Sequence, residues 1–342
     1  MIICDFMFNE KLGKTNLVVN KMGFGGIPIQ RITQEEAREL IVKAVELGVN
    51  FFDTARGYTC SEEYIGNGLK GIRDKIYLAT KSMARTYDLM KKDIEISLNN
   101  LQTDYIDLYQ FHNVKSVDEW DLIVSNDGAL KAILEAKEKG LIKHIGITSH
   151  SKDFLDWLLD SKYVDIIETI QYPLNFLEEE GIELFEKAQK LNVGTIAMKP
   201  LGGGMIDNPI VALKYLMNQE CLSVMIPGIG SIEELIINVS VKKEELNEED
   251  EKYISKVKEE MEKEFCHRCG YCLPCSKGID IPGIFTLEKY FLKYNLQDWA
   301  LTRYNNLKVK ASDCINCGLC VTRCPYQLNI PKKLKEISKL FK

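Results

Sequence analysis

Eight of the eleven cysteines in this 342-residue chain fall into two groups near its end. The first group is Cys266, Cys269, Cys272 and Cys275, and the second is Cys314, Cys317, Cys320 and Cys324. Close spacing of this kind lets neighbouring thiolates reach one bound metal group. Cysteine thiolates are ligands of zinc and of iron–sulfur clusters. The spacing therefore predicts metal chemistry at both groups.

The second group has the spacing C-x₂-C-x₂-C-x₃-C-P, which is typical of iron–sulfur ligation. The first group has one residue fewer before its fourth cysteine, and Ser276 replaces the proline. The two groups also form an internal repeat, since CSKGIDIP matches CPYQLNIP. Tetrahedral zinc usually takes two C-x₂-C pairs across a longer loop, whereas three close thiols hold three corners of a cubane. We expect two 4Fe-4S clusters, with zinc as the alternative.

The region resembles an α-helical ferredoxin module, because residues 283–309 between the two groups have a helical pattern. In two-cluster ferredoxins the fourth cysteine of each run ligates the other cluster. The resemblance implies one cluster held by Cys266, Cys269, Cys272 and Cys324. It implies a second cluster held by Cys314, Cys317, Cys320 and Cys275. Two such clusters would lie close enough to pass single electrons.

Upstream, short apolar segments alternate with amphipathic ones from about residue 22 to residue 240. We expect strands over residues 21–27, 49–54, 75–81, 105–112, 143–149, 165–172, 193–200 and 222–228. Eight strand–helix units favour an α/β fold of the (β/α)₈ TIM barrel type over an open α/β sheet. A hairpin turning at Thr15–Asn16 precedes the barrel, and a helix over 247–265 follows it. The expected domains are the barrel, 1–264, and a mostly α-helical ferredoxin-like domain, 265–342.

Polar side chains stand at the carboxyl ends of three predicted strands. Asp53 and Tyr58 follow the second strand, Lys81 ends the third, and His112 ends the fourth. In barrel enzymes this end carries the chemistry. Each residue alone has an ordinary structural explanation, as a helix cap, a loop aromatic, a solvated lysine or a buried histidine. Their combination predicts a catalytic site.

Residues 6–264 resemble the aldo/keto reductase family, and the cysteine-rich region points to its branch fused to a ferredoxin-like tail. The resemblance lies in LGKTNLVVNKMGFGG, FFDTARGYTCSEEYIG, ATKS, YIDLYQFH, GITS, QYPLN, KPLGGG and IPGIGSIEELIINV. It implies an Asp-Tyr-Lys-His tetrad that reduces a carbonyl. Tyr58 would donate the proton, Lys81 would stabilise the phenolate, and Asp53 would hold the lysine. His112 would orient the carbonyl oxygen.

The resemblance also implies a nicotinamide cofactor. Ser149 and Gln171 match residues that hold the nicotinamide amide, while His150 stands where the family has asparagine. The other expected cofactor contacts are Lys199, Pro200, Leu201, Gly202, Gly228 and Asn238. The family's phosphate-binding lysine falls on Gly228 and an arginine falls on Glu234, so we expect NAD rather than NADP. A flavin remains an alternative, because a hydride carries two electrons and each cluster carries one.

The amino-acid composition limits the kinds of partner that we expect for this protein. The chain has 44 basic and 50 acidic residues and no basic patch, which argues against nucleic acid. No signal peptide is recognisable, and no segment approaches the roughly 20 apolar residues of a membrane span. We expect a cytoplasmic enzyme with a small carbonyl substrate and, as an alternative electron partner, a ferredoxin or another redox protein. The rival functions are a flavin- or ferredoxin-linked electron-transfer enzyme on the same barrel, and a catalytically silent redox partner.

Overall fold

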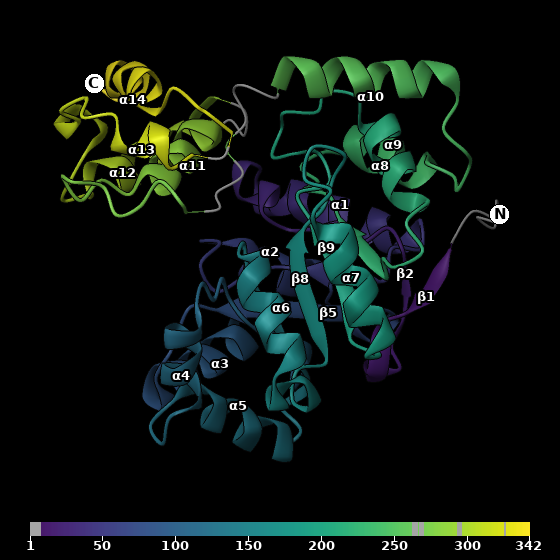
Figure 1. Ribbon diagram of the computed structural model, residues 1–342. Helices are drawn as coiled ribbons and strands as arrows, with labels where there is room; N and C mark the ends of the chain where they lie inside the picture. Colours follow the sequence, from purple (N-terminus) through teal and green to yellow (C-terminus); the bar gives the residue numbers. More distant parts are fainter. Residues whose placement is uncertain (1–7, 262–265, 267–269, 293–295, 325) are drawn as a thin grey trace. The chain divides into compact units, whose positions relative to one another are not determined.

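The computed structural model describes residues 8–261, 266, 270–292, 296–324 and 326–342 (Figure 1). The chain divides into two compact units. The first unit comprises Met1–Leu201 and Asn208–Leu246, and the second comprises Gly202–Asp207 and Asn247–Lys342. The expected domain boundary at residues 264 and 265 lies outside the described residues.

A parallel eight-stranded sheet forms the centre of the first unit, in the order β10-β9-β8-β7-β6-β5-β4-β3. Its strands are β3 Phe24–Gly25, β4 Phe51–Asp53, β5 Tyr77–Ser82, β6 Ile106–Phe111, β7 Ile142–Thr148, β8 Thr169–Pro173, β9 Gly194–Met198 and β10 Val224–Ile226. Parallel bridges from Met22 to Met225 and from Gly25 to Gly228 join the two edges. The predicted barrel is therefore confirmed, and the open sheet is wrong.

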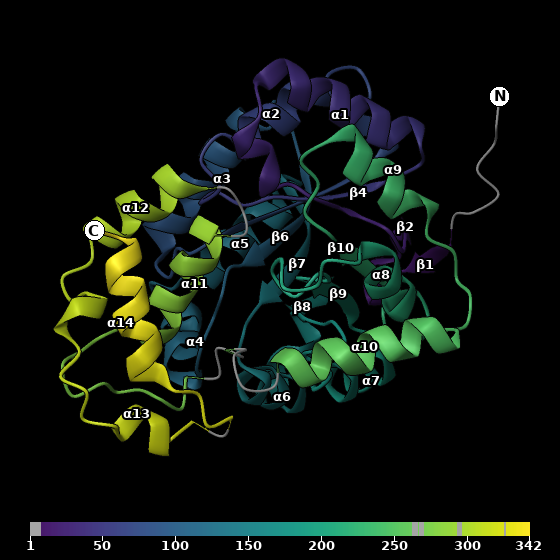
Figure 2. The same cartoon turned by 90° about the horizontal axis from the view of Figure 1, so that it is seen from above.

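Helices surround these strands (Figure 2). They are α1 Gln34–Glu46, α2 Ser61–Gly68, α3 Tyr87–Asn100, α4 Val117–Val124, α5 Ala129–Glu138, α6 Lys152–Asp160, α7 Gly181–Lys190, α8 Pro209–Met217 and α9 Ile232–Ser240. Helix α1 illustrates how the sequence sets their limits. Thr33 and Glu36 form a capping box at its start, and Gly48, with φ of +86°, follows its end.

A hairpin of β1 Asn9–Lys11 and β2 Val18–Asn20 precedes the barrel, and its turn includes Asn16 with φ of +59°. Leu12 and Val19 are fully buried among apolar residues of the strands, including Phe51 at the start of β4. The backbone N–H of Lys14 donates to the Asn192 carbonyl at 2.7 Å, just before β9. The hairpin therefore covers the amino end of the barrel, which leaves the carboxyl end for chemistry.

The second unit is mostly α-helical. Its helices are α10 Glu248–Met261, α11 Ile281–Leu292, α12 Gln297–Asn305, α13 Leu319–Thr322 and α14 Ile330–Leu340. Asn247 and Asp250 cap α10 reciprocally, as the sequence suggests, and residues 262–265 of that predicted helix lie outside the described residues. Buried Ile284 and Ile337 belong to the unit's core, where Tyr304 stacks on Phe341 at 4.3 Å. Within the described ranges, no helix is long and apolar enough to cross a membrane.

Candidate functional site

Neighbouring strands bring the four predicted catalytic residues to one edge of the barrel. Asp53 ends β4, Lys81 is the penultimate residue of β5, and His112 directly follows β6. Tyr58 stands on the loop between β4 and α2. The parallel register pairs Asp53 with Ala79 and Lys81 with Gln110, so the three strands end at similar heights.

Asp53 and Lys81 form a buried ion pair. The Lys81 ammonium donates to the Asp53 carboxylate and, at 2.9 Å, to the Thr54 carbonyl. Gln110 donates its amide N–H to the other Asp53 oxygen at 3.2 Å. Burial raises the pKa of Asp53 and lowers the pKa of Lys81, because each charged form loses its hydration, while the ion pair opposes both shifts. The pair is thus held by protein groups alone.

Tyr58 lies near both the lysine and the histidine. The Lys81 nitrogen is 5.2 Å from the centroid of the Tyr58 ring. The Tyr58 and His112 rings meet edge to face, with their centroids 6.0 Å apart. Burial, followed by the positive charges of Lys81 and Arg85, lowers the pKa of His112 to about 3. A neutral imidazole therefore lies beside a phenol that faces an ammonium.

Arg56 and Glu62 fix the loop that carries Tyr58, and neither residue is among those predicted from the sequence. Glu62 is only 1% exposed, although it lies in the first turn of α2. Its carboxylate accepts from Arg56 at 3.1 Å and, deeper in the barrel wall, from Thr80 at 2.8 Å. The Arg56 backbone N–H donates to the Lys81 carbonyl at 2.9 Å. The loop is thereby tied to β5 on both sides of Tyr58.

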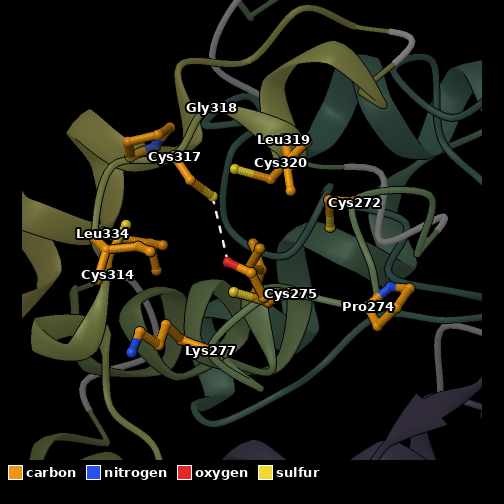
Figure 3. Close-up of a pocket in the computed structure, with 14 residues that line it drawn as sticks. Cys272, Pro274, Cys275, Lys277, Cys314, Cys317, Gly318, Leu319, Cys320 and Leu334 are labelled. Atoms are coloured by element: carbon orange, nitrogen blue, oxygen red, sulfur yellow. Dashed lines mark hydrogen bonds between the residues drawn. The ribbon is translucent and has the colours of Figure 1, made fainter.

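The cysteines of the second unit line two cavities. The first cavity is lined by Cys272, Cys275, Cys314, Cys317 and Cys320 (Figure 3). Cys266, Cys272 and Cys324 line the second, and Cys269 lies outside the described residues. In each cavity the fourth cysteine of one run therefore lies with cysteines of the other run. Cysteine sulfur is the donor that iron–sulfur clusters use, so these linings fit such a group.

Among the residues described, no three side chains of His, Cys, Asp or Glu converge closely enough to hold one ion. The set of Cys275, Cys314, Cys317 and Cys320 is described in full. Its four thiols line one cavity, and cysteine sulfur is a donor both to zinc and to iron–sulfur clusters.

Comparison with known proteins agrees with both parts of the molecule. The sequence pattern of the aldo/keto reductase family matches residues 21–210, and that of a 4Fe-4S dicluster domain matches residues 265–329. The chain belongs to the aldo/keto reductase family. The predicted family, its fusion to a 4Fe-4S domain and the assignment to the oxidoreductases are confirmed.

Individual relatives cover the barrel. L-galactose dehydrogenase of Arabidopsis thaliana is 30% identical in an alignment over 214 residues that covers 57% of this chain and 66% of that enzyme. Methylglyoxal reductase DkgA of Escherichia coli O157:H7 is 29% identical over 193 residues, covering 54% of this chain and 67% of the relative. An aldo-keto reductase of Bacillus halodurans, in its holo form, superposes with a TM-score of 0.63 and 27% identity over 73% of this chain and 96% of its own.

Ser149 and Gln171, two of the residues expected to bind the nicotinamide amide in this aldo/keto reductase, differ in their remaining hydrogen-bonding capacity. Ser149 is fully buried, and its hydroxyl donates to the Val114 carbonyl at 2.5 Å and accepts from the Ser151 N–H at 3.0 Å. His150 follows it and is partly buried. Gln171 on β8 is buried, and its side-chain oxygen has no hydrogen-bond partner among the described residues. An amide N–H of a cofactor would satisfy that oxygen, so Gln171 fits the group and Ser149 has little capacity left.

The loop after β9 contains the next expected contacts. Lys199 has φ of +56°, and its carbonyl accepts from the Asn175 amide at 3.1 Å. Pro200 is buried and Leu201 is partly buried. Gly202, with φ of +57°, begins the short segment assigned to the second unit. Positive φ values at Lys199 and Gly202 indicate a tight turn, and a lysine holds such a conformation only when its surroundings fix it.

The expected phosphate position is closed to a cation. A Cβ atom at Gly228 would lie 2.8 Å from Cγ of Pro28, so no larger residue fits there without movement of the proline ring. Glu234 accepts from the Gly230 N–H at 2.7 Å at the start of α9. Glu234 is the residue on which the resemblance places the family's arginine. Asn238, further along α9, is buried.

Proposed function

We propose that this aldo/keto reductase reduces a small carbonyl compound, or oxidises the matching alcohol, with a nicotinamide cofactor and exchanges electrons through two 4Fe-4S clusters. The observation that carries the proposal is the grouping of Lys81 and His112 around Tyr58, with Lys81 paired to the buried Asp53. These groups supply an acid, a charge that stabilises its conjugate base, and a neutral hydrogen-bonding ring. Carbonyl reduction requires this combination.

Each residue has one role in the proposed reaction. A bound nicotinamide would supply the hydride, which carries two electrons to the carbonyl carbon. Tyr58 gives its hydroxyl proton to the carbonyl oxygen, so one hydride and one proton make the alcohol. Lys81 stabilises the phenolate that remains, and Asp53 keeps the lysine in place. The neutral His112 ring donates its one N–H to the carbonyl oxygen and orients it.

We propose NAD as the preferred nicotinamide. The absence of room at Gly228 and the carboxylate of Glu234 support this choice, because a 2′-phosphate would meet no cation at either position and a negative charge at one. Charge-assisted hydrogen bonds typically contribute ~1.5–3 kcal/mol each. Their loss would weaken NADP(H) and leave NAD(H) unaffected.

The cluster ligands are proposed as crossed sets, Cys266, Cys269, Cys272 and Cys324 for one cluster and Cys314, Cys317, Cys320 and Cys275 for the other. The cysteines that share each cavity support this grouping. Two one-electron centres match the two electrons of one hydride. Their outside partner would be a ferredoxin or another redox protein.

We place the protein in the cytoplasm, where thiols stay reduced, and retain the domain boundary between residues 264 and 265.

The test of the reaction is Tyr58→Phe, which removes the acid and keeps the ring. Turnover should fall by about 10²–10⁴, while the affinity for NADH, measured by titration, stays near that of the wild type. Tyr105→Phe is the matched control, since Tyr105 precedes β6 at the opposite end and its ring contacts Arg73. That variant should turn over normally.

Two results would overturn parts of the proposal. If turnover of Tyr58→Phe equals that of the wild type with every competent electron donor, the tetrad is not catalytic. The flavin-linked or electron-carrier function then takes its place. If NADPH binds more tightly than NADH in the same titration, the proposed cofactor preference is wrong.

A further inference from the structure

The two cysteine cavities differ in their polar surroundings. We call the one lined by Cys275, Cys314, Cys317 and Cys320 the Cys317 cavity, and the one lined by Cys266, Cys272 and Cys324 the Cys324 cavity. The Cys317 cavity is also lined by Ser276 and Lys277. The remaining described lining of the Cys324 cavity is uncharged: Gly270, Ile281, Pro282, Phe285, Tyr326, Leu328 and Ile330.

A side-chain hydrogen bond reaches one of the proposed cluster ligands. The Ser276 hydroxyl lies 3.4 Å from the Cys317 sulfur, as the dashed line in Figure 3 marks. Either atom could donate between a hydroxyl and a free thiol. A cluster-bound sulfur carries no proton, so with a cluster in place the hydroxyl must be the donor. Ser276 then stabilises negative charge on that sulfur.

The internal repeat provides a comparison within the same chain. Ser276 directly follows the fourth cysteine of the first run, and Pro325 directly follows the fourth cysteine of the second. Proline has no side-chain donor and no backbone N–H. A proline at the equivalent position of the second run offers no donor of its own, so the two runs differ in sequence at this point.

Among the described residues, two cations lie at or near the Cys317 cavity. Lys277 lines it, and Arg323 donates to the Pro274 carbonyl at 3.0 Å, next to Cys275 in the chain. Reduction adds one electron and therefore one negative charge to a cluster. Hydrogen bonds to the sulfurs and nearby cations stabilise that charge.

We propose that Ser276 tunes the cluster of the Cys317 cavity to the higher reduction potential of the pair, so that this cluster is reduced first. The inference rests on the proposed function, because it requires two clusters with the crossed ligands given above. The step is a one-electron transfer from a low-potential donor, such as reduced ferredoxin, to an oxidised cluster. No bond forms or breaks in the step, and no proton moves.

The experiment is a redox titration of the full-length protein followed by electron paramagnetic resonance, preceded by iron and sulfide analysis. In Ser276→Ala the equilibrium constant for one-electron reduction of this cluster should fall about threefold. At 59 mV per tenfold change for one electron, the higher of the two midpoint potentials should therefore fall by about 28 mV. The lower potential should not change. Ser338→Ala on α14, whose hydroxyl bonds to the Lys335 carbonyl, is the matched control and should leave both potentials unchanged.

An isosteric pair isolates the hydroxyl if the alanine variant loses its cluster. Ser276→Thr keeps the donor and Ser276→Val replaces it with a methyl group of similar size, so only the valine variant should show the lower potential. With both clusters present, unchanged potentials in every variant, or a shift in the lower one, would overturn the inference and leave the proposed function intact. Zinc without acid-labile sulfide in the wild type would instead overturn the proposed function, and the inference with it.

Discussion

The barrel site and the cysteine cavities position their reactive groups in different ways. In the barrel, Asp53 and Lys81 lie on adjacent strands and bond to each other and to the Thr54 carbonyl. In the second unit, Cys320 lies in the short helix α13, while Cys266, Cys272, Cys275, Cys314, Cys317 and Cys324 lie in loops and turns. The barrel therefore organises its charges before any ligand arrives. The cysteine unit, in contrast, brings its thiols together around a space that a cluster would have to bridge.

This difference determines what each region should lose when a residue is changed. A ligand removed from a cavity removes a bond to the cluster and with it part of the unit's stability, since metal binding and folding are coupled. A residue removed from the tetrad leaves the ladder of eight strands intact. Its cost then comes from the charge left behind.

The largest effect should come from removing cluster ligands in pairs. With crossed ligation, Cys275→Ala and Cys317→Ala damage the same cluster, so the double variant should keep about four iron atoms, one cubane. Cys324→Ala combined with Cys317→Ala damages both clusters and should keep almost none. Iron and acid-labile sulfide analysis of the purified proteins checks both numbers.

Uncrossed ligation would give the reverse result. The Cys275/Cys317 pair would then lose both clusters, and the Cys324/Cys317 pair would keep one. Cys221→Ala, a buried barrel cysteine, is the control and should retain both clusters. In all these variants the barrel unit should still unfold at its usual temperature. A barrel that unfolds early would break the comparison.

An intermediate effect should follow from breaking the buried ion pair. Lys81→Met leaves the Asp53 carboxylate buried without its cation, which typically costs about 3–5 kcal/mol of unfolding free energy. Adding Asp53→Leu removes the stranded charge and should recover most of that loss, while carbonyl reduction stays abolished in both proteins. Denaturant unfolding measured beside turnover separates the two roles of Lys81.

An exposed pair provides the matched control. Lys43 and Glu46 lie 3.2 Å apart on α1, with side chains 43% and 59% exposed. Lys43→Met should cost less than about 1 kcal/mol, because solvent screens such pairs. If Lys81→Met is no more destabilising than Lys43→Met, the barrel site is not preorganised by its ion pair.

The sequence predicted the parts of the site that depend on residue type at a strand end. Asp53, Lys81 and His112 could be placed because eight strands were recognisable and their carboxyl ends must meet. The role of Glu62 could not be predicted, because Glu63 beside it is the same residue type. Only the orientation of helix α2 buries Glu62 and exposes Glu63. The Ser149 hydroxyl donates a hydrogen bond to the carbonyl of Val114, which is 35 residues away in the chain. No local sequence pattern could predict that bond.

The smallest effect concerns the pH dependence of the barrel's stability. The folded pKa of His112 is lowered from 6.5 to about 3, so below pH 6.5 the unfolded chain binds a proton that the folded chain does not. The stabilising contribution of the neutral ring is therefore complete above about pH 6.5 and is lost progressively as the pH falls toward 3. One pH unit below the unfolded pKa, at about pH 5.5, the loss should reach ~1.4 kcal/mol.

His112→Gln keeps a hydrogen-bonding side chain and cannot titrate, so it should lose about that much less stability than the wild type between about pH 7.5 and 5.5. Denaturant unfolding of both proteins at the two pH values checks this, and any acid sensitivity of the clusters cancels because both proteins carry them. Equal losses in the two proteins would show that the ring takes up its proton freely when folded, and that the histidine beside Tyr58 is not held neutral.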